Sequence, residues 1–227
     1  MIVALVPAFN EASRIGKLIS HARDFVDMVV VCDDGSLDAT AVTSLALGAE
    51  VIRHQVNLGY GAALRTLFLK AQTLDADVFV TIDSDGQHDP ASIPALVEPI
   101  INGWADVVIG SRFLMGSNKS TPAHRRLAIK LITRVVGFVV GQTFTDLQSG
   151  LRAYSRSALG LVTPSRRGMG ASIEIILRAA ALRLRIDEIP VSITYNDKRN
   201  PWVQTFRQFL DLFYSVIRFN QKKLLNT

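Results

Sequence analysis

Short apolar runs rich in β-branched residues alternate with helix-patterned stretches in the first half of the chain, and this rhythm constrains the fold most. The predicted strands are residues 2–7, 28–32, 50–54, 77–82 and 107–109. Apolar residues at helical spacing predict intervening helices at 13–25, 38–47, 62–74 and 90–102, with Ser13 and Asp38 as N-caps of the first two. This order predicts an α/β fold, a mostly parallel sheet with helices on both faces.

The second half is less regular. Helices are predicted at 125–140 and 171–184 and a final strand at 186–195, while residues 116–120 resemble a loop. The apolar stretch 125–140 is shorter than the roughly 20 residues that span a bilayer, so it packs in the core or lies on a lipid surface. Residues 1–200 are expected to form one domain, and 201–227 a C-terminal amphipathic helical extension.

A cluster of oxygen-bearing side chains follows the predicted strand 77–82. The sequence there is Asp83-Ser84-Asp85-Gly86-Gln87-His88. If the chain stays extended, Asp83, Asp85 and Gln87 point to one side, because side chains alternate along a strand. Carboxylate and amide oxygens are ligands that Mg²⁺ or Mn²⁺ accepts. The alternative is a polar turn in which Asp83 caps the next helix.

Other polar groups follow the remaining strands, at the sheet edge where ligands of open α/β folds bind. Phe9-Asn10-Glu11 and Asp33-Asp34-Gly35-Ser36 suit a base and a ribose, and Asn57 and Gly61 suit close backbone approach at a helix start. Arg112 follows the fifth strand and suits a phosphate. The first turn lacks the dinucleotide glycine pattern, and no Walker A sequence is present.

Charge divides the chain into two unlike halves within a net charge of +5. Residues 1–106 hold 14 acidic and 6 basic side chains, whereas residues 107–227 hold 6 acidic and 19 basic ones. A basic half predicts contact with phosphate or an anionic membrane surface, and no nucleic-acid motif supports nucleic acid. The single Cys32 fits a reducing compartment, and no secretory signal is visible. We therefore expect a cytoplasmic protein.

Six blocks in fixed order resemble family-2 glycosyltransferases, and among them the dolichyl- or polyprenyl-phosphate sugar synthases such as dolichol-phosphate mannosyltransferases. The resemblance covers residues 1–200, and the blocks are residues 6–11, 33–40, 57–63, 83–88, 110–113 and 146–154. It implies a GT-A fold and a catalytic domain at 1–200, a nucleotide-sugar donor, Mg²⁺ or Mn²⁺ as cofactor, and inversion at the anomeric carbon. It also implies a polyprenyl-phosphate acceptor, and hence a peripheral position at the cytoplasmic face of a membrane.

The resemblance assigns roles by position. It implies that the nucleotide is bound by Pro7, Ala8, Phe9, Asn10, Glu11, Asp33, Asp34, Gly35, Asn57, Gly61, Asp83 and Ser84, and the metal by Asp83, Asp85 and Gln87. The acceptor and its phosphate are expected at Arg112, Arg126, Lys130 and Arg199, and catalysis at Asp146 with Arg112. Asp146 can act as a base or as an orienting, electrostatic group. The alternative for Asp146 is a capping role.

Other functions stay open from the sequence. A saccharide hydroxyl acceptor would not need the basic half, and a non-catalytic nucleotide-sugar or phosphoinositide-binding module would not need Asp83, Asp85, Gln87 and Asp146 together. A sugar-nucleotide pyrophosphorylase would need a glycine-rich loop after the first strand, where Pro7-Ala8-Phe9-Asn10 stands. A homo-oligomer or a membrane-anchoring partner is compatible with the same features.

Overall fold

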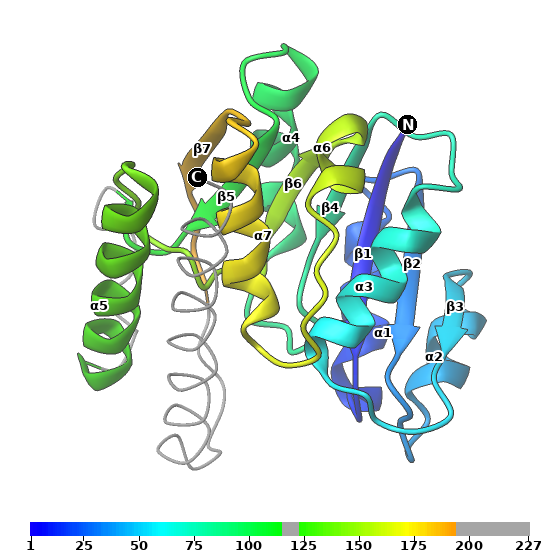
Figure 1. The fold of residues 1–227 in the computed structure, drawn as a ribbon. Helices are drawn as coiled ribbons and strands as arrows, with labels where there is room; N and C mark the ends of the chain where they lie inside the picture. Colours follow the sequence, from blue (N-terminus) through cyan, green and yellow to red (C-terminus); the bar gives the residue numbers. More distant parts are fainter. Residues whose placement is uncertain (115–122, 194–227) are drawn as a thin grey trace.

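A single twisted sheet organises the molecule (Figure 1). Within residues 1–114 and 123–193, which the computed structural model describes, seven strands pair in the order β3-β2-β1-β4-β6-β5-β7. The strands are β1 (Ile2–Ala8), β2 (Met28–Asp33), β3 (Glu50–Arg53), β4 (Val78–Thr81), β5 (Val107–Ser111), β6 (Arg152–Ser155) and β7 (Ile186–Pro190). β1, β2, β3 and β4 pair in parallel, as do β5 and β7, which confirms the predicted mostly parallel α/β sheet.

β6 was not predicted, and it is the one antiparallel strand among those described. It lies between β4 and β5 and is followed at once by a short helix, α6 (Arg156–Leu161), which was also missed. The strand has only four residues, and it begins with Arg152, which is 2% exposed. The Arg152 guanidinium donates to the carbonyl oxygens of Leu147, Ser149 and Ser172. Only tertiary contacts make a buried arginine acceptable here, so no local pattern reveals the strand.

Helices cover both faces of the sheet (Figure 1). On one face lie α3 (Tyr60–Ala71), α6 and α7 (Ala171–Ala181), and on the other α1 (Ala12–Ala22) and α4 (Ile93–Ile101). The short helix α2 (Thr40–Ala46) packs on α1 and β3, and α5 (Ala123–Val140) packs against α7. The predicted helix 90–102 begins as a separate 3₁₀ turn, η1 (Pro90–Ser92).

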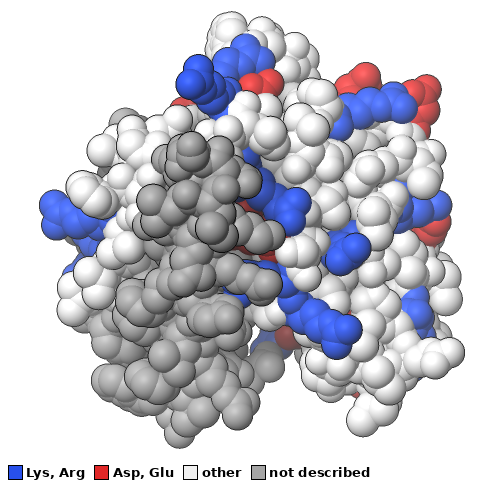
Figure 2. All heavy atoms as spheres, viewed as in Figure 1, with Lys and Arg blue, Asp and Glu red and all other residues white. Residues whose placement is uncertain are grey.

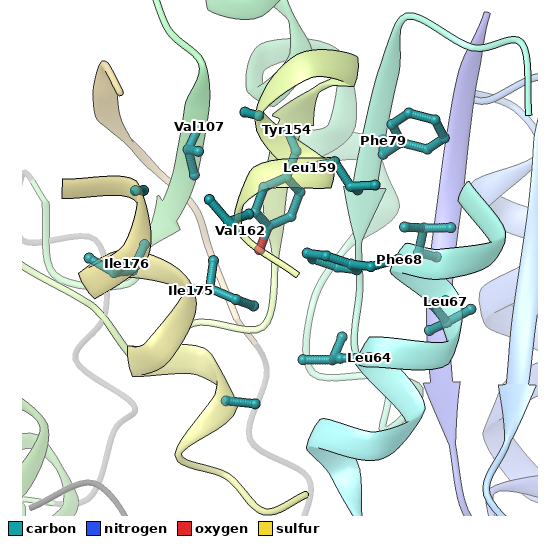
Figure 3. Close-up of a cluster of buried hydrophobic side chains, with 14 of the residues drawn as sticks. Leu64, Leu67, Phe68, Phe79, Val107, Tyr154, Leu159, Val162, Ile175 and Ile176 are labelled. Carbon is teal, nitrogen blue, oxygen red and sulfur yellow. The ribbon is translucent and has the colours of Figure 1, made fainter. Parts of the chain in front are cut away.

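Two apolar clusters, one on each face, hold the layers together. Figure 3 shows the cluster on the α3 side, where Phe68 of α3 meets Tyr154 of β6 edge to face, with ring centroids 5.2 Å apart. Leu64 and Leu67 of α3 and Ile175 of α7 extend the same cluster. Burying a side chain of this size stabilises the fold by about 1.5–3 kcal/mol. The cluster therefore fixes α3 and α7 relative to the strands that carry the polar groups.

The first helix begins differently from the prediction. α1 starts at Ala12, with Glu11 at the N-cap, so Ser13 lies inside the helix and is not the cap. The N–H of Ala12 donates instead to Oδ2 of Asp38, at 3.1 Å, and Oδ1 of Asp38 accepts the N–H of Thr40 at 3.0 Å. One carboxylate thus satisfies the first turns of two helices, α1 and α2. The N-cap of α2 is Ala39, so the prediction of Asp38 as that N-cap was wrong by one residue, although the Asp38 carboxylate accepts the N–H of the first residue of each helix.

The last predicted strand is shorter than expected. β7 ends at Pro190, which has no N–H to donate, rather than continuing to residue 195. Residues 194–227, which include the predicted C-terminal amphipathic extension 201–227, lie outside the described residues. Its assignment as an extension of a 1–200 catalytic domain stays a prediction. Within residues 1–114 and 123–193, no helix combines the length and apolarity needed to cross a bilayer.

Candidate active site

The strands β1, β2, β4 and β5 run in the same direction and end at the same edge of the sheet (Figure 1), where polar residues follow each strand. β6 runs the other way, so the segment that leads into it, residues 145–151, arrives at the same edge. The turns after β4 and β5 therefore lie beside the Asp146 block. The topology, which the sequence did not reveal, brings these three motifs together.

The turn after β4 groups Asp85 with Gln87. The chain does not stay extended, because Gly86 adopts φ 71°. Oδ1 of Asp85 accepts the main-chain N–H of Gln87 at 3.0 Å, and Oδ2 accepts the side-chain amide N–H at 2.7 Å. The expectation of alternating side chains was therefore wrong, although the residues do meet. The capping alternative for Asp83 is also wrong, since Asp89 accepts the N–H of Ala91 at the start of η1.

Asp83 occupies a closely built position. Its Oδ1 accepts the Tyr60 hydroxyl at 3.0 Å, and the main chain at Gly150 lies directly against the carboxylate, where any Cβ would overlap it. Burial, followed by the nearby charge of Asp85, raises the pKa of Asp83 to about 6. The Tyr60 hydrogen bond and the charge of Arg152 act in the opposite direction. An apposed cation would relieve the conflict between two neighbouring carboxylates.

The donor set fits a divalent metal that is completed by substrate. Among the described residues, no three His, Cys, Asp or Glu side chains cluster closely enough to hold a metal alone. Mg²⁺ sites that bind nucleotides commonly use one or two carboxylates together with substrate phosphates. Asp83 and Asp85, two neighbouring carboxylates that repel each other, match that pattern, and Gln87 is held beside Asp85 by a hydrogen bond. The chemistry of these residues therefore fits the expected Mg²⁺ or Mn²⁺.

Arg112 and Asp146 form a buried, two-pronged ion pair. Nε of Arg112 lies 2.5 Å from Oδ2 of Asp146, Nη2 lies 2.7 Å from Oδ1, and the main-chain N–H of Arg112 also donates to Oδ2 at 3.1 Å. Arg112 is 4% exposed and Asp146 is 0% exposed. The structure thus places both predicted catalytic residues together. The Arg112 guanidinium binds the carboxylate of Asp146, whereas the sequence analysis expected it to bind a phosphate.

His88 lies next to this pair and was not assigned a role from the sequence. Burial, and then the charge of Arg112, lowers the pKa of His88 to about 4, while Asp146 acts in the opposite direction. Its Nδ1 is buried and has no hydrogen-bond partner among the described residues. The main chain at His88 bridges to Ile193, which ties the turn after β4 to the segment after β7. His88 is therefore a neutral, buried polar group beside Arg112 and Asp146.

The residues predicted to bind the nucleoside lie in the turns after β1 and β2. Asp33 is fully buried, with Oδ1 accepting the N–H of Ser36 and Nε of Arg53 3.1 Å from Oδ2. The Arg53 contact lacks hydrogen-bond alignment, so Oδ2 has no hydrogen-bond partner among the described residues. Asn10, at φ 55°, accepts the N–H of Leu37 and donates its own N–H to Ser36. An unsatisfied buried carboxylate oxygen is suited to an N–H of a base.

The other residues predicted to bind the nucleotide differ in exposure. Phe9 is 43% exposed at the rim, whereas Pro7, Ala8 and Ser84 are buried. Glu11 is also buried and pairs with Arg14, 2.8 Å away. Phe9 is thus the exposed aromatic side chain of the first block.

Asp34, Gly35 and Gly61 are engaged by the chain itself. The carboxylate of Asp34 accepts the N–H groups of Leu58 and Gly59 and contacts His54 at 2.7 Å. Gly35, at φ 76°, packs against the main chain of residues 56–57. Close approach at Gly35 therefore serves internal packing and brings the turn after β2 against Asn57.

The amino end of α3 is closed by main chain. A Cβ at Gly61 would overlap the carbonyl oxygen of Arg166, and the N–H of Gly61 donates to the carbonyl oxygen of Arg167 at 2.8 Å. The expectation that Gly61 gives a ligand close backbone approach at a helix start is therefore not met. The loop at residues 165–168 takes that place, and Glu174 holds the loop by accepting the N–H groups of Ser165 and Arg166.

The remaining predicted cations lie apart from this cluster. Arg126 and Lys130 are exposed on α5, which stands beyond the β5–β7 side of the sheet (Figure 1). Arg199 lies outside the described residues. Lys and Arg side chains dominate the charged atoms on the face drawn in Figure 2. Tyr60, His88 and Arg152 lie within the blocks 57–63, 83–88 and 146–154, but the sequence analysis gave them no role, because their partners in the structure come from distant segments.

Comparison with known proteins agrees with this architecture. Glucosyl-3-phosphoglycerate synthase from Mycobacterium tuberculosis, solved with Mn²⁺, UDP and glucosyl-3-phosphoglycerate, superposes with a TM-score of 0.76 at 21% identity, over 96% of this chain and 79% of that one. The same enzyme with Mg²⁺ and UDP gives a TM-score of 0.72. At this identity the similarity establishes the fold, which is GT-A-like.

Sequence comparison is more specific. The UDP-N-acetylglucosamine–dolichyl-phosphate N-acetylglucosaminyltransferase of Methanococcus voltae is 30% identical, over 100% of this chain and 98% of its own length. The polyprenol monophosphomannose synthase of Mycolicibacterium smegmatis is 29% identical, over 85% and 77%. The profile of glycosyl transferase family 2 matches residues 3–162. The chain therefore belongs to glycosyl transferase family 2 and is a glycosyltransferase.

Proposed function

We propose that this glycosyltransferase moves a hexose from a UDP- or GDP-sugar to a polyprenyl phosphate, with inversion at the anomeric carbon and with the help of Mg²⁺ or Mn²⁺. Relatives whose names specify dolichyl or polyprenyl phosphate acceptors support the acceptor class. The observation that carries the proposal is the position of the buried Arg112–Asp146 pair beside the Asp83–Asp85 turn. Burial and the charge of Asp85 raise the pKa of Asp83, and the charge of Arg112 lowers it, which supports a single site for these groups.

Donor binding is assigned to the turns after β1, β2 and β4. Oδ2 of Asp33 has no hydrogen-bond partner among the described residues, but it is fully buried beside Arg53, so in this proposal a base N–H reaches it only if Arg53 moves. Phe9 is exposed in the turn after β1. Asp83, Asp85 and Gln87 would hold the metal against the donor diphosphate. A bound metal neutralises negative charge on the departing nucleoside diphosphate without proton transfer. Tyr60 and Gly150 keep the Asp83 carboxylate in place for this task.

Asp146 acts in this proposal by orienting Arg112. It has no exposed surface, and its two oxygens accept donors from Arg112 and Gln148, so a substrate hydroxyl reaches it only by displacing Arg112. His88, with a pKa of about 4, is a weak base near neutral pH. A lipid phosphate is already ionised and needs no base, whereas a saccharide hydroxyl does. The site therefore favours the phosphate acceptor.

A membrane-bound acceptor requires the protein to meet the lipid surface. We assign this contact to the outer face of α5, where Leu127, Leu131 and Phe138 are 71%, 51% and 89% exposed. Arg126, Lys130 and Arg134, one helical turn apart and also exposed, flank this apolar row. Exposed apolar and cationic stripes on one helix suit an anionic leaflet. In this proposal the enzyme is peripheral at the cytoplasmic face of the membrane.

Metal-dependent donor binding tests the assigned site. Calorimetric titration with UDP and with GDP, in the presence and absence of Mn²⁺, should show binding that the metal strengthens. Asp85→Asn removes a charge but little volume, so the fold should survive while the effect of Mn²⁺ is lost. Asp24→Asn, at an exposed position in the turn after α1, is the matched control. Equal metal-dependent binding by Asp85→Asn and wild type would overturn the metal assignment.

A further inference from the structure

A carboxylate outside the predicted motifs holds the main chain that carries Asp146. Glu188 of β7 accepts the N–H of Thr145 at 2.7 Å and the Thr145 hydroxyl at 3.0 Å through Oε2. Its Oε1 accepts the N–H of Asp146 at 2.9 Å. Two consecutive main-chain N–H groups are thus bound by the two oxygens of one side chain. These hydrogen bonds fix the main chain at Asp146, and thereby the position from which its side chain projects.

The same carboxylate is tied to the strand that leads to Arg112. β5 and β7 pair in parallel with Ile109 opposite Glu188 and Ser111 opposite Pro190, so Arg112 follows directly after the paired region. The hydroxyls of Ser111 and Thr145 lie 2.5 Å apart, which closes a second link between β5 and the turn. Glu188 therefore joins the two segments whose side chains form the Arg112–Asp146 pair.

The position of Glu188 disfavours an ionised carboxylate, so we infer that its charged, hydrogen-bonded form serves the site. It is partly buried, and burial raises its pKa, with the charge of Asp146 acting in the same direction and the hydrogen bonds opposing both. Ile186, two residues earlier and on the same side of the strand, packs with the apolar cluster on the α3 side. A hydrophobic residue at 188 would continue that pattern, but it would leave the N–H groups of Thr145 and Asp146 without an acceptor.

We propose that Glu188 is a positioning residue for glycosyl transfer. It sets the main chain at residues 145–146, Asp146 in turn holds the Arg112 guanidinium, and Glu188 itself touches neither donor nor acceptor. This inference rests on the proposed roles of Asp146 and Arg112. Partners that orient the groups of a site often matter about 10–100-fold when they are removed. The effect belongs to turnover, because the contacts to the nucleotide are made by other turns.

Four proteins test the proposal: wild type and the variants Glu188→Gln, Asp146→Asn and the double variant. Each is assayed with Mn²⁺, polyprenyl phosphate and the radiolabelled UDP- or GDP-sugar that labels wild type best, and donor affinity is measured separately by calorimetry. Glutamine places an N–H₂ group where one N–H now donates, so the turn loses an acceptor with little change in volume. Asp187→Asn, an exposed neighbour on β7, is the control.

We expect Glu188→Gln to lower kcat about tenfold or more with donor affinity within about twofold of wild type. Because Glu188 acts through Asp146, the double variant should be no slower than Asp146→Asn alone. A merely structural role predicts the opposite, namely losses that multiply and a parallel fall in donor affinity, and that result would overturn the proposal. If Glu188→Gln turns over normally while Asp146→Asn is impaired, the proposal for Glu188 is overturned and the proposed function stands. If Asp146→Asn also turns over normally, the proposed role of Asp146 in the site is overturned as well.

Discussion

At the scale of single residues, the site holds two neighbouring carboxylates, Asp83 and Asp85, in a partly buried position where ionisation is unfavourable. Burial raises the pKa of Asp83 to about 6, and the like charge of Asp85 adds to this shift. An acid whose pKa is raised in the folded state contributes stability only below its ordinary pKa of 3.8, and loses that contribution as pH rises through 6. The metal-free protein is therefore least stable above about pH 6, where the Asp83 carboxylate is ionised and able to bind a cation.

Asp83→Asn should accordingly raise the melting temperature of the metal-free protein at pH 8. The gain should shrink as pH falls through 6 towards 4, because the wild-type carboxyl is then neutral as well. Thermal unfolding in EDTA at a series of pH values measures this, with the exposed Asp24→Asn as control. A gain that is independent of pH would show that Asp83 is not strained by its charge.

Asp146→Asn should lower kcat by roughly 100-fold while donor affinity changes only a few-fold, because the orientation of Arg112 matters in the transition state. The variant also leaves a buried guanidinium with a neutral partner, so the melting temperature should fall. Turnover must therefore be expressed per folded molecule. A parallel loss of donor affinity and kcat would make Asp146 a donor ligand or a structural cap.

At the scale of elements, the sequence predicted the parts that local pattern controls. β1, β2 and β4 are apolar runs within the buried sheet, and their positions were predicted within two residues. β6 was missed because its buried Arg152 is explained only by carbonyl groups from distant segments. The motifs themselves were visible in the sequence, yet the Arg112–Asp146 pair depends on β6 lying between β4 and β5. Motif chemistry is therefore local, and site geometry depends on the strand order.

The amino end of α3 offers a test at this scale. Gly61→Ala should destabilise the protein by roughly 1–3 kcal/mol, because its Cβ would meet the Arg166 carbonyl oxygen and Ala171. Gly160→Ala on α6 is the matched control, since its Cβ would meet nothing closer than 3.8 Å, and it should be neutral or gain up to about 1 kcal/mol. Urea unfolding compares the two. Similar stability of both variants would contradict the tight docking of loop 165–168 on α3.

At the scale of the whole molecule, the proposed contact with the membrane lies on the outer face of α5. Its inner side chains Ile129, Ile132 and Val136 are buried, so the exposed Leu131 and Phe138 are not needed for the core. Replacing both by Ser should weaken sedimentation with anionic vesicles without lowering the melting temperature. Binding by wild type should fall as salt rises, because the flanking Arg126, Lys130 and Arg134 contribute roughly 1 kcal/mol each at an anionic surface.

If the wild-type protein does not sediment with anionic vesicles even at low salt, docking through α5 is contradicted. Binding that persists unchanged in the Leu131→Ser, Phe138→Ser variant would move the contact to another surface.

The central claim is transfer to a lipid phosphate, and acceptor choice tests it most directly. The enzyme is incubated with Mn²⁺ and radiolabelled UDP- and GDP-sugars in parallel reactions that contain polyprenyl phosphate, the corresponding polyprenol, or a soluble saccharide. The account predicts organic-extractable label with polyprenyl phosphate alone, and its loss in Asp146→Asn. Transfer to the saccharide or to the polyprenol at a comparable rate would contradict it, because the site would then be activating a hydroxyl group.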